Sequence, residues 1–141
     1  MKLTEIKKDL FDMPEEYHLA HCISSDAAMG AGIAVLFKKK FNLSILIKLA
    51  KQNELEIGTC RRVDKILNLI TKKNYWNKPT YDSLTNAIVS MKQVCLSEGI
   101  NKIAMPEIGC GLDKLQWSKV KEIILDIFSD TEMEIIVCRI N

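Results

Sequence analysis

The chain has 141 residues and a net charge of +2, with 48% hydrophobic and 27% charged residues. This composition is typical of a single globular domain and argues against a nucleic-acid binder driven by bulk charge. The five cysteines are odd in number and form no C-x-x-C pair, which favours a reducing compartment over a disulfide framework or a structural zinc site. The first residues lack the apolar core of a signal peptide, and no apolar run is long enough to span a membrane. We therefore expect a cytoplasmic protein, or a nuclear one in a eukaryote.

The chain begins with two predicted strands separated by a turn. Leu3–Lys8 alternates polar and apolar residues, which predicts a strand that ends at Asp9. Pro14 breaks the following segment, and Tyr17–Ile23 is predicted to form a second, central strand. Both strands therefore lead into polar segments.

The stretch His21–Phe41 is predicted to run from that second strand through a loop of small residues into a helix. Gly30 and Gly32 precede an apolar run that begins at Ile33. Small residues let the backbone approach a ligand closely, and the free N–H groups and dipole at a helix start favour a phosphate. From these residues alone, an ordinary strand-to-helix turn with glycines for close packing stays open as the alternative.

The middle of the chain is predicted to form a helix and a pair of strands. The helix begins at Asn42–Ser44, and the strands are Glu54–Val63 and Lys65–Thr71, joined by a tight turn. The second of these strands leads directly into Lys72 and Lys73.

A long helix and a short strand follow. Thr80 is the predicted N-cap of a helix whose apolar positions lie within Leu84–Cys95, and Gly99 is predicted to end it. Lys102–Pro106 is then a short strand that leads into a second glycine loop, Glu107–Asp113.

The last helix and strand close the predicted fold. Ser118 is predicted to cap the helix, and Glu132–Ile140 is the closing strand. The apolar face of this helix is predicted to consist of Val120, Ile123, Ile124, Ile127 and Phe128.

Strands that alternate with helices predict an α/β fold, in which helices cover both faces of a sheet. Ligands of such sheets bind at the carboxyl ends of the strands. Polar or glycine-rich segments follow the predicted strands at Asp9, Ser24–Gly32, Lys72 and Gly109–Asp113. We therefore expect these segments to converge on one cleft.

His18 and His21 are three positions apart on a predicted strand. Residues at positions i and i+3 of a strand face opposite sides, so the two histidines are not expected to bind one metal ion. Lys38–Lys40 is a local basic run, which on a helix is usually a solvated face.

Residues in three parts of the chain carry a more specific signal. They are AHCIS (20–24), MGAGIA (29–34) and FKKKF (37–41); LITKK (69–73) and KPTY (78–81); and MP (105–106), IGCGLD (108–113) and LQW (115–117). With these blocks the chain resembles the macro domain, an ADP-ribose-binding family. It is most similar to the terminal ADP-ribose protein glycohydrolase subgroup, which also deacetylates O-acetyl-ADP-ribose. The resemblance implies one macro domain over residues 1–141, with a mixed, mostly parallel sheet of about six strands between helices.

The resemblance also implies roles for individual residues. Lys72 would be the catalytic lysine, which attacks the anomeric carbon of the distal ribose and releases the carboxylate of an ADP-ribosylated Glu or Asp. Asp113 would resolve the lysine adduct as acid and base, Asp9 would accept a hydrogen bond from the adenine amino group, and Ser24 would lie near the distal ribose. The other implied substrate-binding residues, which include both phosphate-binding glycine loops, are Leu10, His21, Met29, Gly30, Ala31, Gly32, Ile33, Pro106, Gly109, Cys110, Gly111, Leu112 and Ile140. The scheme needs no metal and no cofactor.

Three positions depart from the pattern of the family. Lys8 stands where many macro domains have a glycine before the adenine-binding aspartate, and Glu107 stands where a basic residue is expected. Cys138 stands near the position of an aromatic residue beside the adenine in a relative. These departures concern adenine packing and substrate preference rather than the catalytic pair.

The proposed role of Lys72 places a demand on its protonation state. A free lysine side chain has a pKa of about 10.4, so a nucleophilic lysine needs burial or a nearby positive charge to lose its proton. Lys73 carries such a charge, but adjacent residues of a strand face opposite sides, which leaves desolvation on ligand binding as the expected cause. The alternative, in which Lys72 stays charged and steadies substrate oxygens, stays open at this point.

The resulting interpretation is a monomeric hydrolase of ADP-ribosylated proteins and of O-acetyl-ADP-ribose. One alternative is a non-catalytic ADP-ribose reader, which would need neither Lys72 nor Asp113. Another is a hydrolase of ADP-ribose linked to nucleic acid, whose phosphates Lys38–Lys40 would favour. An unrelated dinucleotide-binding domain is disfavoured because no G-x-G-x-x-G follows the first strand.

Overall fold

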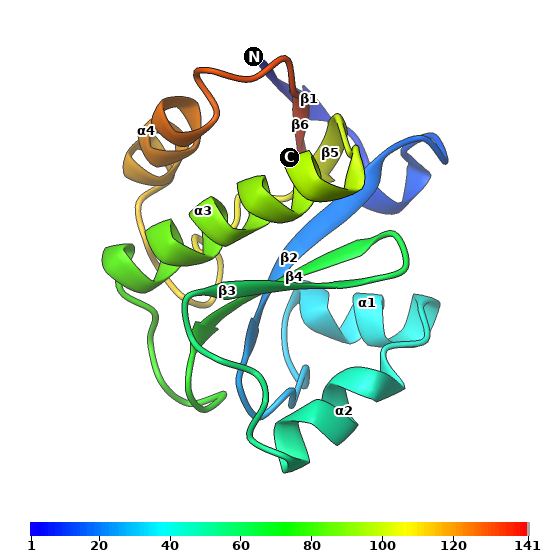
Figure 1. Ribbon diagram of the computed structural model, residues 1–141, viewed down its shortest axis with the longest axis vertical. Helices are drawn as coiled ribbons and strands as arrows, with labels where there is room; N and C mark the ends of the chain where they lie inside the picture. The colour runs from blue at the N-terminus through cyan, green and yellow to red at the C-terminus, as the bar shows by residue number, and fades with distance from the viewer. Residues whose placement is uncertain (141) are drawn as a thin grey trace.

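A computed structural model describes residues 1–140, in which a six-stranded sheet lies between two layers of helices (Figure 1). The strands are β1 (Lys2–Lys7), β2 (His18–Ser24), β3 (Thr59–Val63), β4 (Ile66–Lys72), β5 (Lys102–Met105) and β6 (Glu134–Arg139). Their order across the sheet is β1-β6-β5-β2-β4-β3, and neighbouring strands are parallel except for the antiparallel pair β3 and β4. The predicted α/β fold is confirmed. The predicted domain extends to Asn141, which lies outside the described residues.

The ends of most strands lie within two residues of their predicted positions. The prediction for Glu54–Val63 was wrong in its first half, because strand pairing begins only at Thr59. Before that point Gly58 has a φ of 82°, and its N–H donates a 2.7 Å hydrogen bond to the Ile70 carbonyl oxygen. A left-handed glycine of this kind turns the chain into the sheet edge instead of extending the strand.

The helices are α1 (Ile33–Lys40), α2 (Ser44–Lys51), α3 (Tyr81–Glu98) and α4 (Trp117–Ile127), with a short 3-10 helix η1 (Leu10–Asp12). The predicted ends of α3 are confirmed. The Thr80 hydroxyl accepts the Ser83 N–H at 3.0 Å, and the Ser83 hydroxyl accepts the Thr80 N–H at 3.0 Å. This capping box satisfies two free donors, and Gly99 ends the helix in the left-handed conformation with a φ of 69°.

The predicted cap at Ser118 was wrong, because the N-cap of α4 is Gln116, two residues earlier, and the helix begins at Trp117. Two long-range hydrogen bonds select this start. The Gln116 N–H donates to the Tyr81 hydroxyl at 3.0 Å, and the Trp117 indole N–H donates to Glu5 Oε1 at 2.7 Å. Both partners are distant in sequence, so local capping rules could not identify them.

The two faces of the sheet carry separate hydrophobic cores. Helices α3 and α4 cover one face, where Ile88 and Ile124 are fully buried. Helices α1 and α2 cover the other face, where Phe37 and Leu46 are fully buried (Figure 1). Strand β4 is buried along nearly its whole length, as expected for a strand that has helices on both sides. The sheet is therefore a rigid support for the loops that leave its carboxyl edge.

Candidate functional site

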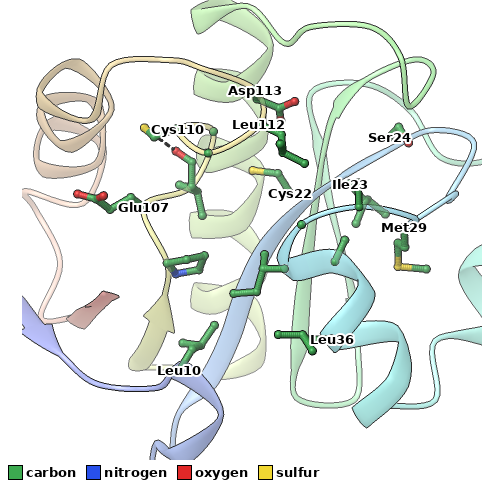
Figure 2. A pocket seen from close by; sticks show the side chains of 18 of the residues that line it. Leu10, Cys22, Ile23, Ser24, Met29, Leu36, Glu107, Cys110, Leu112 and Asp113 are labelled. Carbon is green, nitrogen blue, oxygen red and sulfur yellow. Dashed lines mark hydrogen bonds between the residues drawn. The ribbon is translucent and has the colours of Figure 1, made fainter. Parts of the chain in front are cut away.

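A cleft of about 1020 Å³ lies where the carboxyl ends of the parallel strands meet. The segments after β1, β2, β4 and β5 all contribute to its lining, and the end of β6 completes it. Figure 2 shows Ser24, Leu112 and Asp113 toward one end of this cleft and Leu10 toward the other. The expected convergence of the strand-end segments is confirmed, and the volume is at the upper end of the range of small-molecule sites.

The cleft brings together nearly all the residues that the sequence singled out. Sixteen of them line it: Asp9, Leu10, Ser24, Met29, Gly30, Ala31, Gly32, Ile33, Lys72, Pro106, Gly109, Cys110, Gly111, Leu112, Asp113 and Ile140. His21 does not join them, because its side chain lies in the hydrophobic core.

His21 is fully buried on the face of β2 that packs against α1. Its ring stacks on Phe37 with the ring centroids 3.9 Å apart, and Nε2 lies 2.7 Å from Asn68 Oδ1. Burial lowers the pKa of His21 to about 4, although the hydrogen bond to Asn68 acts in the opposite direction. The expectation that His21 contacts the ligand is therefore replaced by a structural role as a neutral core residue.

Lys72 and Asp113 form an ion pair at one end of the cleft. Lys72 Nζ lies 2.7 Å from Asp113 Oδ1, and each side chain is only 15% exposed. The two residues come from the end of β4 and from the loop after β5, 41 positions apart in sequence. The distance is that of a charge-assisted hydrogen bond, which allows a proton to pass directly between the two groups.

A bulge at the end of β2 places this lysine beside the glycine loop. Ile23 pairs with Ile70, but the next pair is Ser24 with Lys72, so β4 has one extra residue at this point. The Ser25 N–H then donates to the Lys72 carbonyl oxygen at 2.8 Å. Bulges of this kind redirect the side chains at a strand end, and here Lys72 faces the cleft.

Asp26 organises the loop between β2 and α1. Its carboxylate accepts hydrogen bonds from the Ser24 hydroxyl, from the Ala28 N–H at 3.1 Å and from the Tyr75 N–H at 2.9 Å. Burial acts to raise the pKa of Asp26, but these hydrogen bonds and the charge of Lys72 outweigh it and hold the pKa below its usual value. Asp26 thus joins the first glycine loop to the loop that follows β4.

The first glycine loop approaches the second across the cleft. Gly32 precedes α1 with a φ of 63°, and a Cβ atom built on it would lie 3.3 Å from Leu112 Cδ1. The Leu112 side chain therefore reaches over the start of α1, although it is 61% exposed. Because Gly32 has no side chain, the space in front of the backbone N–H groups at this helix start stays open.

The second glycine loop is closed by its own backbone. The Leu115 N–H donates to the Gly109 carbonyl oxygen at 2.8 Å, and Gly109 has a φ of 75°. A Cβ atom at Gly109 would lie 3.1 Å from Leu115 Cδ1 and 3.2 Å from Leu84 Cδ2. This position therefore requires glycine for its conformation and for its space, which explains one of the glycines in the IGCGLD block.

Three cysteines, Cys22, Cys110 and Cys138, line the cleft, and burial raises the pKa of each thiol. Burial raises the pKa of Cys22 to about 12, and the nearby Asp113 carboxylate acts in the same direction. Burial followed by the charge of Glu107 raises the pKa of Cys110 to about 11. Because the thiolate is the nucleophilic form, these thiols are poor nucleophiles at neutral pH.

Several lining residues were not predicted as site residues. Cys22 could have been found from the alternation of a strand, since it shares a face with Ser24. Tyr75 and Lys78 lie in the loop after Lys72, for which the sequence pattern gave no geometry. Glu107 and Arg139 both line the cleft, with Arg139 Nε and Glu107 Oε2 3.7 Å apart.

Within residues 1–140, the structure contains no group of three or more His, Cys, Asp or Glu side chains able to hold a metal ion. Over the same residues, every helix is too short or too polar to cross a bilayer.

Comparison with known proteins identifies the family. The macro domain family model matches residues 20–124. The ADP-ribose glycohydrolase OARD1 of Homo sapiens is 46% identical over 138 residues, which are 96% of this chain and 90% of that protein. A DNA ADP-ribosyl glycohydrolase of Thermus aquaticus is 25% identical over 90% of this chain, which corresponds to 38% of that protein. The solved macrodomain of Thermus aquaticus DarG has a TM-score of 0.89 and 24% identity, with 97% of each chain covered. The chain therefore belongs to the macro domain family.

Proposed function

We propose that this protein is a hydrolase that releases ADP-ribose from Glu or Asp ester linkages in proteins and removes the acetyl group of O-acetyl-ADP-ribose. The observation that carries the proposal is the 2.7 Å contact between Lys72 Nζ and Asp113 Oδ1 at one end of the cleft. A reader that only binds ADP-ribose has no use for a lysine and a carboxylate in this contact. The homology supports the same class, since the Homo sapiens relative is named ADP-ribose glycohydrolase.

The cleft offers each part of ADP-ribose a matching group. Asp9 lines the cleft next to Leu10, which lies toward the end away from Asp113 (Figure 2), and it offers its carboxylate to the adenine amino group. The loop Gly30–Gly32 and the free N–H groups at the start of α1 are suited to the pyrophosphate. In this orientation the distal ribose lies between the two glycine loops, beside Lys72 and Asp113.

The reaction proceeds in two displacements at the anomeric carbon of the distal ribose. Lys72 first passes a proton to Asp113, and the neutral amine then donates its electron pair to the anomeric carbon. The bond from this carbon to the ester oxygen breaks, and its electron pair leaves with the Glu or Asp carboxylate. Acetate is the leaving group when the acetyl group sits on the anomeric oxygen.

Water completes the cycle. It attacks the same carbon, the carbon–nitrogen bond breaks, and the electron pair returns to Lys72. Asp113 is close enough to Lys72 Nζ to give and take the protons of both steps. The balance is one water consumed, with ADP-ribose and a free carboxylic acid as products.

Nucleic acid is a second candidate acceptor. The Thermus aquaticus relative is named DNA ADP-ribosyl glycohydrolase, and Lys73, Lys78 and Lys114 are exposed near the Lys72 end of the cleft. Their charges would attract a phosphate backbone.

The test compares wild type with Lys72→Ala and Asp113→Ala on a Glu-linked mono-ADP-ribosylated protein and on O-acetyl-ADP-ribose. Calorimetry measures the affinity of each variant for ADP-ribose. Both substitutions are expected to abolish release while ADP-ribose still binds. Lys51→Ala and Asp126→Ala, which change exposed residues of α2 and α4, are the matched controls. Wild-type protein that binds ADP-ribose but turns over neither substrate would identify a reader instead.

A further inference from the structure

The loop between β4 and α3 exposes two adjacent aromatic rings. Tyr75 is 63% exposed and Trp76 is 65% exposed, and their ring centroids lie 5.0 Å apart at an interplanar angle of 87°. Exposure of large aromatic rings to water is energetically unfavourable, so a rigid and exposed pair usually marks a contact surface.

The conformation of this loop is fixed. The Tyr75 N–H donates to Asp26 Oδ2 at 2.9 Å, which ties the ring pair to the loop after β2. Asn77 closes a turn with Asn74 in both directions: Asn77 Oδ1 accepts the Asn74 N–H at 2.8 Å, and the Asn77 N–H donates to the Asn74 carbonyl oxygen at 3.0 Å. The rings are thus presented on a defined support.

The position of the pair relates it to the reaction. Tyr75 lines the cleft and follows Lys72 by three residues, so the ring pair lies at the end where the distal ribose is placed. The acceptor attached to that ribose must leave the cleft on this side. Tyr75 and the Trp76 ring packed against it therefore stand beside the path of groups attached to the ribose.

The charges around the rings select the chemistry of the acceptor. Lys73, Lys78 and Lys114 are exposed on the surrounding segments. The neighbouring carboxylates of Asp26 and Asp113 are held in hydrogen bonds to other groups of the protein. Aromatic faces bordered by positive charge are the usual features of surfaces that stack unpaired bases and attract the phosphate backbone.

We infer that Tyr75 and Trp76 form an acceptor-side subsite that stacks an unpaired base of single-stranded nucleic acid next to the ADP-ribosylated residue. The inference rests on the proposed hydrolase function, and it deepens that proposal by assigning the acceptor to residues at the rim of the ADP-ribose cleft. Lys73 contributes to the affinity through the backbone phosphates.

The first experiment measures kcat/KM on three substrates: an ADP-ribosylated single-stranded oligonucleotide, a Glu-linked ADP-ribosylated peptide and O-acetyl-ADP-ribose. Trp76→Ala and Tyr75→Ala are each expected to lower the value for the oligonucleotide about tenfold or more, because stacking of one base typically supplies that much. The kcat/KM of Trp76→Ala for O-acetyl-ADP-ribose should stay within about twofold of the wild-type value, because Trp76 lies outside the lining of the cleft. Trp76→Phe should retain most of the activity, since a phenyl ring still stacks.

Leu96→Ala is the matched control, because Leu96 is 61% exposed near the far end of α3. An equal loss on all three substrates would overturn the subsite, as would no loss on any of them. A loss confined to the peptide would replace the nucleic-acid acceptor by a polypeptide.

A second experiment separates the subsite from the catalytic proposal. Binding of an unmodified thymidine oligonucleotide to the Asp113→Ala protein is followed by tryptophan fluorescence at several salt concentrations. The protein with Tyr75 and Trp76 intact should bind the oligonucleotide, and the added substitution Trp76→Ala should abolish this binding. The added substitution Lys73→Gln should reduce the slope of log affinity against log salt. If the oligonucleotide binds but the wild-type protein turns over none of the three substrates, the hydrolase proposal alone is wrong. If the wild-type protein turns over substrate but oligonucleotide binding does not depend on Trp76, the subsite alone is wrong.

Discussion

The ammonium group of Lys78 donates a 2.7 Å hydrogen bond to the carbonyl oxygen of Leu112, the residue immediately before Asp113. On the far side of the same loop, the Tyr81 hydroxyl accepts the Gln116 N–H at 3.0 Å. Lys78, just before α3, and Tyr81, the first residue of α3, therefore hold the segment that carries Asp113 at both of its ends. This relationship gives the KPTY block a physical role, which is to position the carboxylate against Lys72.

Loss of the Lys78 contact should reduce turnover more than binding. We expect Lys78→Met to lower kcat on O-acetyl-ADP-ribose by about 10- to 100-fold, because small displacements of a catalytic group have effects of this size. The KM and the calorimetric affinity for ADP-ribose should change little. Lys78→Arg keeps a donor of similar reach and should restore most of the rate.

The small substrate is chosen because it has no macromolecular acceptor, so any effect of the Lys78 charge on acceptor binding is removed. Lys51→Met, on the exposed surface of α2, is the matched control. Equal losses in kcat and in ADP-ribose affinity would indicate a general structural defect and not misplacement of Asp113.

Lys72→Arg distinguishes the two roles that the sequence left open for this lysine. Arginine can keep the ion pair with Asp113, but it stays protonated in proteins and supplies no neutral amine. If Lys72 is the nucleophile, single-turnover release of ADP-ribose should fall by more than about 10³-fold, as when other nucleophiles are removed. Retention of a substantial part of the rate would show instead that a positive charge is sufficient.

Gly109→Ala should destabilise the protein, whereas Gly111→Ala should not. Alanine at Gly109 would have a φ of 75° and a Cβ atom 3.1 Å from Leu115 and 3.2 Å from Leu84. The left-handed conformation alone costs about 1–2 kcal/mol, and the close contacts add to it. A Cβ atom at Gly111 meets no atom within 4 Å among the described residues.

Urea unfolding of both glycine variants at neutral pH checks this prediction. The midpoint should fall for Gly109→Ala and stay near the wild-type value for Gly111→Ala, with unchanged slopes. Similar midpoints for the two variants would mean that the loop relaxes enough to accept a side chain at either position.

The stability of the protein should fall in acid partly because of His21. Its pKa is lowered to about 4 in the folded state, against an ordinary value of 6.5. Between these two values the unfolded chain binds a proton that the folded chain does not, so the free energy of unfolding decreases as the pH falls through this window. The loss approaches about 3 kcal/mol near the lower end, since each pKa unit corresponds to about 1.4 kcal/mol.

The measurement is urea unfolding of wild type and His21→Gln from pH 7.5 to 4.5. Glutamine can still bond to Asn68 but does not titrate, so the variant is expected to be less stable at neutral pH and to lose less stability in acid. Unfolding of His18→Gln is measured over the same pH range for comparison. Burial, followed by the positive charges of Arg62 and Lys65, also lowers the pKa of His18. Parallel curves for wild type and His21→Gln would contradict the prediction.

Much of the fold could be predicted from the sequence because its signals are local. Alternating residues in Leu3–Lys8 and the largely apolar run before Lys72 indicated strands, and both strands are present. Thr80 and Gly99 delimit α3 as predicted, because each satisfies the free backbone groups of a helix end through its nearest neighbours. The glycine blocks also indicated where the cleft would form.

Tertiary packing decided the features that depend on distant partners. Ser118 is a residue type that is favoured as a helix cap, but hydrogen bonds to Tyr81 and Glu5 select an earlier start for α4. His21 lies in a block that indicated ligand contact, yet its strand face turns it toward Phe37. In both cases a contact between residues far apart in sequence outweighed a local preference.

The geometry of the candidate site shows the same division. The sequence by itself determined that a strand leads into Lys72 and that Asp113 closes a glycine loop. Only the tertiary structure decided that they meet at 2.7 Å, because a bulge shifts Lys72 toward the cleft and the contacts of Lys78 and Tyr81 hold the opposite loop. Such a distance depends on the summed packing of a whole sheet and its loops, which no local pattern of residues encodes.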